Sequence, residues 1–154
     1  MTIEETLEDV CASLSVQTTF MPVSSLNEAN WLADALLTAQ YPLCLVLPVI
    51  VTDAPGKSGI LKSKFPLAVY FLNKSTEITT DFKSSEIAPY IKTMRDLARE
   101  FIHKLNETDL IDPETDGIGE RSYEPEYGLL DAHLFGVLCR ASVPVMEGVT
   151  GCVP

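Results

Sequence analysis

The sequence lacks a long hydrophobic run. A helix needs about 20 predominantly apolar residues to cross a bilayer, and the longest apolar stretch of this 154-residue chain, residues 42–52, has eleven. The first residues are acidic, whereas a secretory signal peptide begins with a basic segment. We therefore expect a protein with neither a membrane span nor an export signal, made in the cytoplasm.

Basic residues are scarce, with 11 Lys and Arg against 22 Asp and Glu, for a net charge of −11. Nucleic-acid binding depends on clustered Lys and Arg that neutralise phosphates. The nearest approach to such a cluster is Lys57, Lys62 and Lys64, which we interpret as the solvated edge of a hairpin. We expect no sequence-specific contact with nucleic acid and no membrane partner, and the negative charge favours solubility.

Closely spaced cysteine pairs are also missing. None of the four cysteines lies within three residues of another, which excludes a C-x-x-C redox or zinc pair. Cys11, Cys44 and Cys139 lie within apolar stretches, where a free Cys behaves as a small hydrophobic residue. We expect reduced thiols in or near the core, with Cys152 as the reactive one.

The chain has no complete phosphate-binding loop. Residues 56–58 read Gly-Lys-Ser directly after an apolar run, but the first Gly of the G-x-x-x-x-G-K-[ST] pattern is replaced by Val51. Pro55 also removes a backbone N–H that phosphates would use. We interpret the segment as a hairpin turn and expect no nucleotide cofactor.

A complete calcium loop is lacking as well. Residues 112–120 resemble the start of an EF-hand loop, with acidic residues at positions 1, 3, 5 and 9 and Gly117 at position 6. Position 12 is Tyr123 instead of a bidentate Glu, and no helical pattern follows. We interpret the segment as a solvated acidic loop without a metal.

Histidine is rare, and no nucleophile accompanies it. His103 projects from the polar face of a predicted helix, near the helix end that favours a positive charge. Asp131 and His133 would share a face if they lay on a strand, but no G-x-S-x-G elbow occurs. We therefore expect neither catalytic residues nor an enzymatic activity.

Helical periodicity marks two amino-terminal segments. The first has apolar residues at Ile3, Leu7, Val10, Cys11 and Leu14, and Thr2 and Glu5 have the capping-box spacing. After a short β-prone stretch at residues 18–21, a second helix is predicted from Ser25 or Asn27 to Ala39. Its inward residues are expected to be Leu26, Trp31, Leu32, Ala35 and Leu36.

The strongest helical pattern begins at Ser84 or Ser85 and ends at Asn106. Pro89 is tolerated there because it falls in the first turn. Residues 108–128 are acidic and rich in Gly and Pro, and predict a long loop with a strand near residues 121–123. The apolar face of the helix is Ile87, Tyr90, Ile91, Met94, Leu97, Ala98, Phe101, Ile102 and Leu105.

Three segments predict strands. Residues 42–51 are a continuous apolar run that indicates a buried strand, with Pro48 marking a bulge or an edge. Residues 60–73 predict a second strand, paired with the first as a hairpin, and residues 52–56 a turn or loop. The third strand, residues 134–146, alternates Phe135, Val137, Cys139, Ala141 and Val143 on one face.

Together these elements predict a single α+β domain over residues 1–154, with a loose carboxy-terminal tail from about residue 147. Its sheet is expected to be mainly antiparallel. One long helix and one or two shorter amino-terminal helices are expected to pack on it.

The order of elements also carries a resemblance to a known group. Tyr41-Pro42 leads into the apolar strand, the long helix and acidic loop follow, residues 131–137 (Asp-Ala-His-Leu-Phe-Gly-Val) enter the last strand, and Cys152-Val153-Pro154 ends the chain. In this order the chain resembles small proteins from the tail-morphogenesis regions of Bacteroidetes phages and prophages. More distantly, it resembles phage tail terminator and head–tail joining proteins.

This resemblance implies a structural role in virion assembly. Such proteins have an α+β fold and assemble as rings, usually hexameric, that cap or join the tail tube. It implies a homo-oligomer that contacts other tail or connector proteins, in the bacterial cytoplasm during assembly and in the virion afterwards. The candidate contacts lie on two segments. The hairpin connection at residues 52–63 carries Lys57 and Lys62, and the loop at residues 108–128 carries Asp109, Asp112, Glu114, Asp116 and Glu120.

An alternative function remains open. The long helix and the sheet could enclose an apolar pocket, which would make the chain a small-molecule or regulatory protein-binding module.

Overall fold

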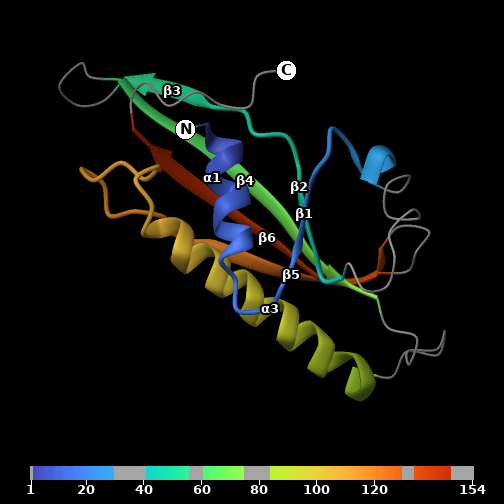
Figure 1. Cartoon of the computed structure of the whole chain (residues 1–154). Coiled ribbons are helices and arrows are strands. Elements are labelled where there is room, and N and C mark those ends of the chain that lie inside the picture. Colours follow the sequence, from blue (N-terminus) through green and yellow to red (C-terminus); the bar gives the residue numbers. More distant parts are fainter. Residues whose placement is uncertain (1, 30–40, 56–60, 75–83, 130–133, 147–154) are drawn as a thin grey trace.

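The structure, a computed structural model, describes residues 2–29, 41–55, 61–74, 84–129 and 134–146. A six-stranded, mostly antiparallel sheet carries two helices on one face, α1 (Ile3–Ala12) and α3 (Ser84–Asn106), as Figure 1 shows. The predicted α+β class is confirmed. Among the described residues, no helix combines the length and apolar composition needed to cross a membrane.

The two longest strands form the centre of the sheet, whose order is β1-β2-β4-β6-β5. β4 and β6 pair antiparallel from Ser63 opposite Val145 to Asn73 opposite Phe135. β2 and β3 pair with the same edge of β4, β3 with the start of β4 and β2 with its end. β1 runs parallel to β2. The strands are β1 (Thr19–Pro22), β2 (Leu43–Val46), β3 (Thr52–Pro55), β4 (Leu61–Asn73), β5 (Arg121–Leu129) and β6 (Leu134–Val145).

The first predicted helix is confirmed, including its cap. The Thr2 hydroxyl accepts a hydrogen bond from the Glu5 N–H at 3.1 Å, and the Glu5 carboxylate accepts one from the Thr2 N–H at 2.9 Å. This reciprocal pair satisfies two N–H groups that a helix start leaves free. All five predicted core residues are buried: Ile3, Leu7, Val10, Cys11 and Leu14.

Only the start of the second predicted helix is described. Residues 26–29 are helical, and the Ser25 hydroxyl accepts from the Glu28 N–H at 3.2 Å, as an N-cap does. Leu26, expected to point inward, is 40 % exposed, because Ala29 takes the buried side of this turn. Trp31, Leu32, Ala35 and Leu36 lie outside the described residues.

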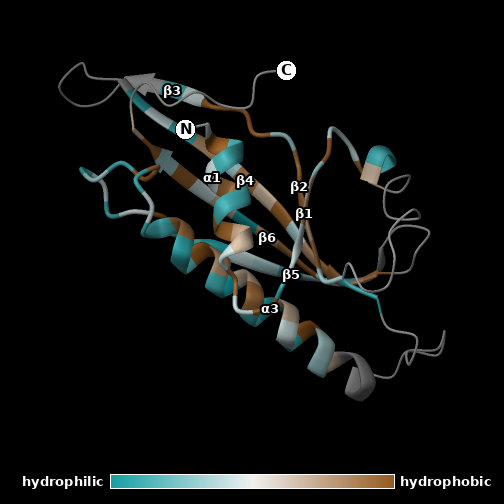
Figure 2. Cartoon of the chain, viewed as in Figure 1, coloured by the Kyte–Doolittle hydropathy of each residue, from teal (hydrophilic) through white to brown (hydrophobic). Residues whose placement is uncertain are grey.

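The predicted bounds of α3 are confirmed, as is the described part of its apolar face, whereas the Ile87 side chain lies outside what the structure describes. Its apolar stripe packs on the sheet, whereas Tyr90 at its edge is only half-buried. Figure 2 shows hydrophobic residues on the side of α3 that faces the strands and hydrophilic ones on its outer side. The described residues of the stripe that are buried are Ile91, Met94, Leu97, Ala98, Phe101, Ile102 and Leu105.

The sheet has an apolar cluster on each face. Phe65, Leu67, Val69 and Phe71 of β4 join the helix-side cluster, as do the alternating residues predicted for β6. The residues that alternate with these point to the other face of the sheet and join the second cluster. Because apolar residues point to both faces, the strands appear in the sequence as continuous apolar runs. The second cluster is Met21, Val23, Ala29, Leu43, Leu45, Tyr70, Leu72, Leu134 and Leu138.

One predicted turn is a strand in the structure, and one predicted loop is shorter than expected. Residues 52–55, expected in a turn, form β3, because the start of β4 offers them a pairing partner. Residues 108–120 form a loop as predicted, whereas the strand expected near residues 121–123 is the start of β5, which continues to Leu129 beside β6. Pro125 is tolerated there because β5 ends the sheet order, and a proline on a sheet edge can turn its missing N–H outward.

The predicted apolar strand at 42–51 is shorter than expected. Only Leu43–Val46 forms β2, and the chain leaves the strand before Pro48. The hairpin with residues 60–73 is confirmed, as Leu43 lies opposite Leu72. The predicted tail from about residue 147 lies outside the described residues.

At one point β4 and β6 approach each other very closely. Gly136 of β6 lies opposite Leu72, and a Cβ added there would overlap the carbonyl oxygen of Phe71. The glycine is therefore required by the contact between the two backbones.

Candidate functional site

The predicted contact residue Lys62 pairs with acidic residues of its own chain. Its Nζ lies 3.1 Å from a carboxylate oxygen of Glu114 and 3.6 Å from one of Asp112. The hydrogen bond that Lys62 donates to the Glu114 carboxylate raises the pKa of Lys62. The structure thus brings together three of the residues expected to meet between subunits, and it joins them within one subunit.

Two further predicted contact residues have no charged partner among the described residues. Asp116 and Glu120 are exposed on the same loop and form no ion pair with a described residue. Lys57 lies outside the described residues. A contact of this loop with a neighbouring subunit stays a prediction.

Internal hydrogen bonds shape the loop at 108–120. The Asp112 carboxylate accepts from the Glu114 N–H at 3.0 Å, and the Asn106 side chain accepts from the Ile118 N–H at 2.9 Å. Gly117 has φ +83°, which favours glycine. Ile118 is only 3 % exposed and holds the loop to the core.

The residues that resembled a calcium loop do not converge on one point. Among the described residues, no group of three His, Cys, Asp or Glu side chains could hold a metal ion. His103 instead lies 3.3 Å from Glu107, one helical turn on and just past the end of α3. Asp131 and His133 lie outside the described residues.

Three of the four cysteines are buried, as predicted for Cys11, Cys44 and Cys139. Burial raises the pKa of Cys139 to about 12 and that of Cys44 well above its usual value. The Cys11 thiol donates to the Thr18 carbonyl at 3.7 Å. These thiols are core groups, and Cys152 lies outside the described residues.

The largest hollow that we describe lies between the two helices. This α1–α3 cleft has a volume of about 840 Å³ and is open to solvent on one side. Its floor is apolar, because Val10 and Leu110 are each only 5 % exposed there. The lining residues are Thr6, Asp9, Val10, Ser13, Lys104, Glu107, Thr108, Asp109 and Leu110.

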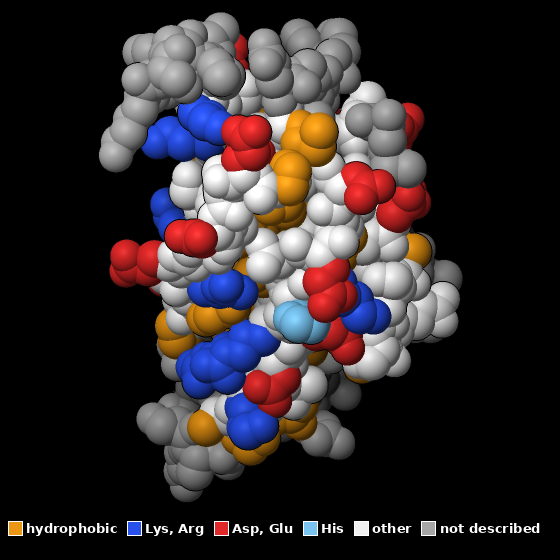
Figure 3. Space-filling model, turned by 90° about the vertical axis from the view of Figure 1, so that its left-hand side faces the viewer, with side chains coloured by type: hydrophobic (Ala, Val, Ile, Leu, Met, Phe, Trp, Pro, Cys, Tyr) orange, Lys and Arg blue, Asp and Glu red, His pale blue; other side chains and the backbone are white. Residues whose placement is uncertain are grey.

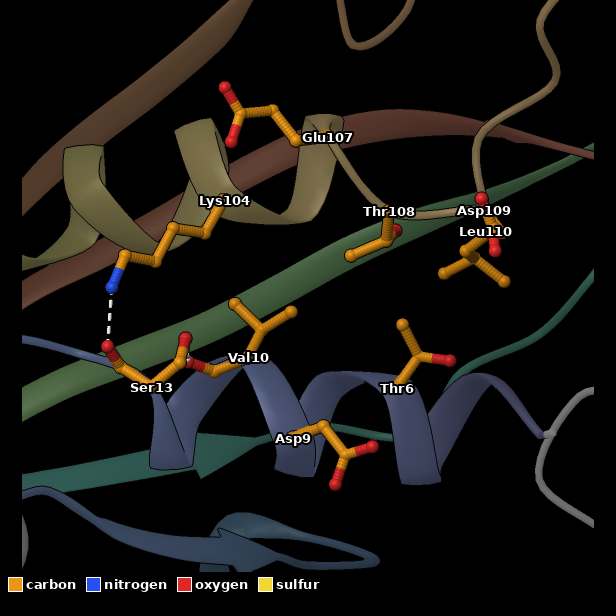
Figure 4. A pocket seen from close by; sticks show the side chains of 9 residues that line it. All are labelled: Thr6, Asp9, Val10, Ser13, Lys104, Glu107, Thr108, Asp109 and Leu110. Atoms are coloured by element: carbon orange, nitrogen blue, oxygen red, sulfur yellow. Dashed lines mark hydrogen bonds between the residues drawn. The ribbon is translucent and has the colours of Figure 1, made fainter.

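Carboxylates form the rim of the α1–α3 cleft. In Figure 4, Thr6 and Val10 point from α1 toward the end of α3, whereas Asp9 and Glu107 point away from the gap on opposite sides. Lys104 reaches across and donates to the Ser13 carbonyl. Its charge is thereby held at one end of the cleft, and the rest of the rim is acidic.

The whole of α1 adds to this negative charge. Its ten residues include Glu4, Glu5, Glu8 and Asp9 and no basic residue. The composition of α1 is the sequence signal from which an acidic surface could have been predicted. The sequence did not reveal that α3 would lie opposite α1.

A second charged surface lies on the other side of α3. Lys92, Arg95 and Arg99 follow the i, i+3, i+7 spacing of one helix flank, and the Arg99 guanidinium stacks 5.4 Å from the Tyr123 ring centroid in β5. With Arg121 of β5, these residues form what we call the basic flank. Figure 3 shows most Lys and Arg side chains gathered along the left side of the face in view.

Two residues of the basic flank, Arg95 and Arg121, have no carboxylate partner among the described residues. Asp96 lies 2.8 Å from Lys92 and 3.7 Å from Arg99. The half-buried Arg95 forms no ion pair with any described residue. Arg121 donates hydrogen bonds to the backbone carbonyls of Gly119 and Ile118. Arg95 is therefore the residue of this flank whose charge we take as available to an outside partner.

The interface between α3 and the sheet is filled with buried side chains, among them Phe101 and Phe71. An apolar groove of about 560 Å³ lies elsewhere, between the start of α1 and the segments that follow β1 and β2. Ile50 on its edge is 66 % exposed.

No protein-family model matches this chain, and no curated protein matches it. The argument for a function therefore depends on the surfaces described above.

Proposed function

We propose that the chain is a structural, non-enzymatic phage or prophage tail protein, similar to a tail terminator or head–tail connector subunit. Copies of the chain associate head-to-tail into a ring on the tail tube. The α+β fold, with helices on one face of the sheet, is the fold that the resemblance implies.

The observation that carries this proposal is the separation of charge across α3. Glu100 and Lys104 reach the residues after α1 on one flank, where the rim of the α1–α3 cleft is acidic. Arg99 reaches Tyr123 on the opposite flank, which is basic. A head-to-tail contact joins two different surfaces, and these two attract each other.

A two-fold dimer is less favoured by the same geometry. Such a dimer uses one self-complementary patch on both subunits. Both charges would have to lie in that patch, and here α3 separates them.

The experiment is a mass measurement of the purified chain by sedimentation and native mass spectrometry at low and high salt. We expect a ring of fixed subunit number at low salt that dissociates as salt screens the charges. Lys64→Glu changes an exposed charge away from both flanks and serves as the control. A two-fold dimer insensitive to salt would contradict the proposal.

A further inference from the structure

We infer that the α1–α3 cleft receives the basic flank of a neighbouring copy of this chain, with Arg95 at the centre of the contact. This inference rests on the proposed head-to-tail assembly and names its two surfaces.

The α1–α3 cleft has the chemistry that a long basic side chain needs. Arg and Lys bury an aliphatic stem along apolar surface while the charged end stays near polar groups. Val10 and Leu110 give the cleft an apolar floor. Asp9 and Asp109 are exposed at its outer edge, where Asp9 points away from the gap, so their carboxylates can meet only the charged end of a side chain that passes over this floor. Neither carboxylate forms an ion pair with a described residue, so both are available to an incoming cation.

The basic flank offers the matching groups. Arg95 has no ion pair with a described residue, and Lys92 lies one turn before it on the same flank. Arg99 is held against Tyr123, which gives the flank a fixed edge. A planar guanidinium also binds carboxylates with two parallel hydrogen bonds, which favours Arg95 over a lysine as the central contact.

The occupant is a second copy because a subunit cannot fill its own cleft with its own flank. The two surfaces lie on opposite flanks of α3, which Lys104 and Arg99 mark by their contacts with Ser13 and Tyr123. The whole chain carries a net charge of −11. Two copies therefore repel each other in most orientations, and the contact of flank with cleft is an attractive one.

The charged loop at 108–120 is less suited to this contact. Lys62 is already paired with Asp112 and Glu114 within the subunit. The free charges that complement each other lie at the α1–α3 cleft and the basic flank instead.

The test uses two charge-reversed variants of the full chain. One carries Asp9→Lys and Asp109→Lys, which makes the cleft rim basic. The other carries Lys92→Glu and Arg95→Glu, which makes the basic flank acidic. Each variant alone sets like charges against each other, so we expect its self-association constant to fall at least tenfold from the wild-type value.

The mixture of the two variants is the decisive sample. Both contacts in it again join opposite charges, so we expect association to return as an alternating 1:1 assembly, which native mass spectrometry identifies by mass. The matched control is Lys64→Glu, which changes an exposed charge elsewhere and should associate as the wild type does. Circular dichroism verifies that each variant is folded, and Asp9→Asn with Arg95→Gln supplies a milder pair.

The outcomes separate this inference from the proposed function. If the wild type forms a ring and both charge-reversed variants form it equally well, the interface is elsewhere and the proposed ring stands. If the wild type and the mixture both stay monomeric at low salt and high concentration, the inference and the proposed self-assembly are both wrong.

Discussion

Phe101 of α3 and Phe71 of β4 meet edge to face, with ring centroids 5.4 Å apart and ring planes inclined at 62°. Both side chains are fully buried. This arrangement brings the positive edge of one ring to the negative face of the other. The pair therefore fixes the position of α3 over the longest strand of the sheet.

Replacing the helix-side ring should strongly destabilise the fold. We expect Phe101→Ala to lower the free energy of unfolding by about 3–5 kcal/mol, through lost burial and the cavity left behind. Lys92→Ala, on the exposed side of the same helix, should cost less than about 0.5 kcal/mol. Denaturant unfolding measures both, and an unchanged midpoint for Phe101→Ala would contradict the packing described.

Two neighbouring glycines of the 108–120 loop should respond differently to alanine. A Cβ at Gly117 would overlap the Asn106 side chain, and its φ of +83° strains any residue with a Cβ. A Cβ at Gly119 meets no atom within 4 Å. We expect Gly117→Ala to cost about 1–3 kcal/mol, since it also disturbs the Asn106–Ile118 hydrogen bond, and Gly119→Ala to cost little.

Glu100 should make the free energy of unfolding depend on pH. Partial burial alone would raise its pKa. The hydrogen bond from the Ser15 N–H at 2.8 Å, a second one from the Ser15 side chain and the charge of Lys104 together outweigh this and lower the pKa of Glu100. A carboxyl with a lowered folded-state pKa stabilises the fold above its unfolded-state pKa, and this contribution disappears as the pH falls through the folded-state value.

The substitution Glu100→Gln tests this dependence. We expect it to reduce the free energy of unfolding at neutral pH and to have a smaller effect in acid, where the wild-type carboxyl is protonated. The control is Glu8→Gln on α1, since no described residue forms a hydrogen bond with the Glu8 carboxylate. An equal effect of Glu100→Gln at both pH values would contradict the assignment.

Thiol reactivity should divide the four cysteines into two classes. Burial excludes reagent from Cys11, Cys44 and Cys139 and keeps the last two protonated, so they should react slowly in the native protein. The sequence predicts that Cys152 reacts fast. A disulfide reagent should therefore show one rapid phase that Cys152→Ser abolishes, and denaturant should expose the rest. A rapid phase that survives in Cys152→Ser would refute this division.

The elements with a strong local pattern were predictable from sequence. The bounds of α3 follow from an unbroken apolar stripe, and the cap of α1 from the spacing of Thr2 and Glu5. The alternation in β6 identified the residues that join the helix-side core. In each case the signal is contained in the segment itself.

β3 was missed, and β5 was predicted only at residues 121–123, because the stability of both strands comes from their partner strands. Residues 52–55 contain turn-forming Asp and Pro, and β5 contains Pro125 and Gly128. Pairing with β4 and β6 outweighs these local preferences. The α1–α3 cleft was unpredictable for a related reason, since Asp9 and Asp109 are a hundred positions apart and only the packing of both helices on one sheet face brings them together.

Because of the contact at Gly136, the centre of the sheet cannot accept even one added methyl group at this position. Large side chains around it can be exchanged for others of similar volume, because neighbouring rotamers adjust. A single methyl group at position 136 meets a main-chain carbonyl of β4, which cannot move unless the two longest strands separate. In a library of all single substitutions, this position should therefore retain only glycine, while larger core residues nearby accept several alternatives.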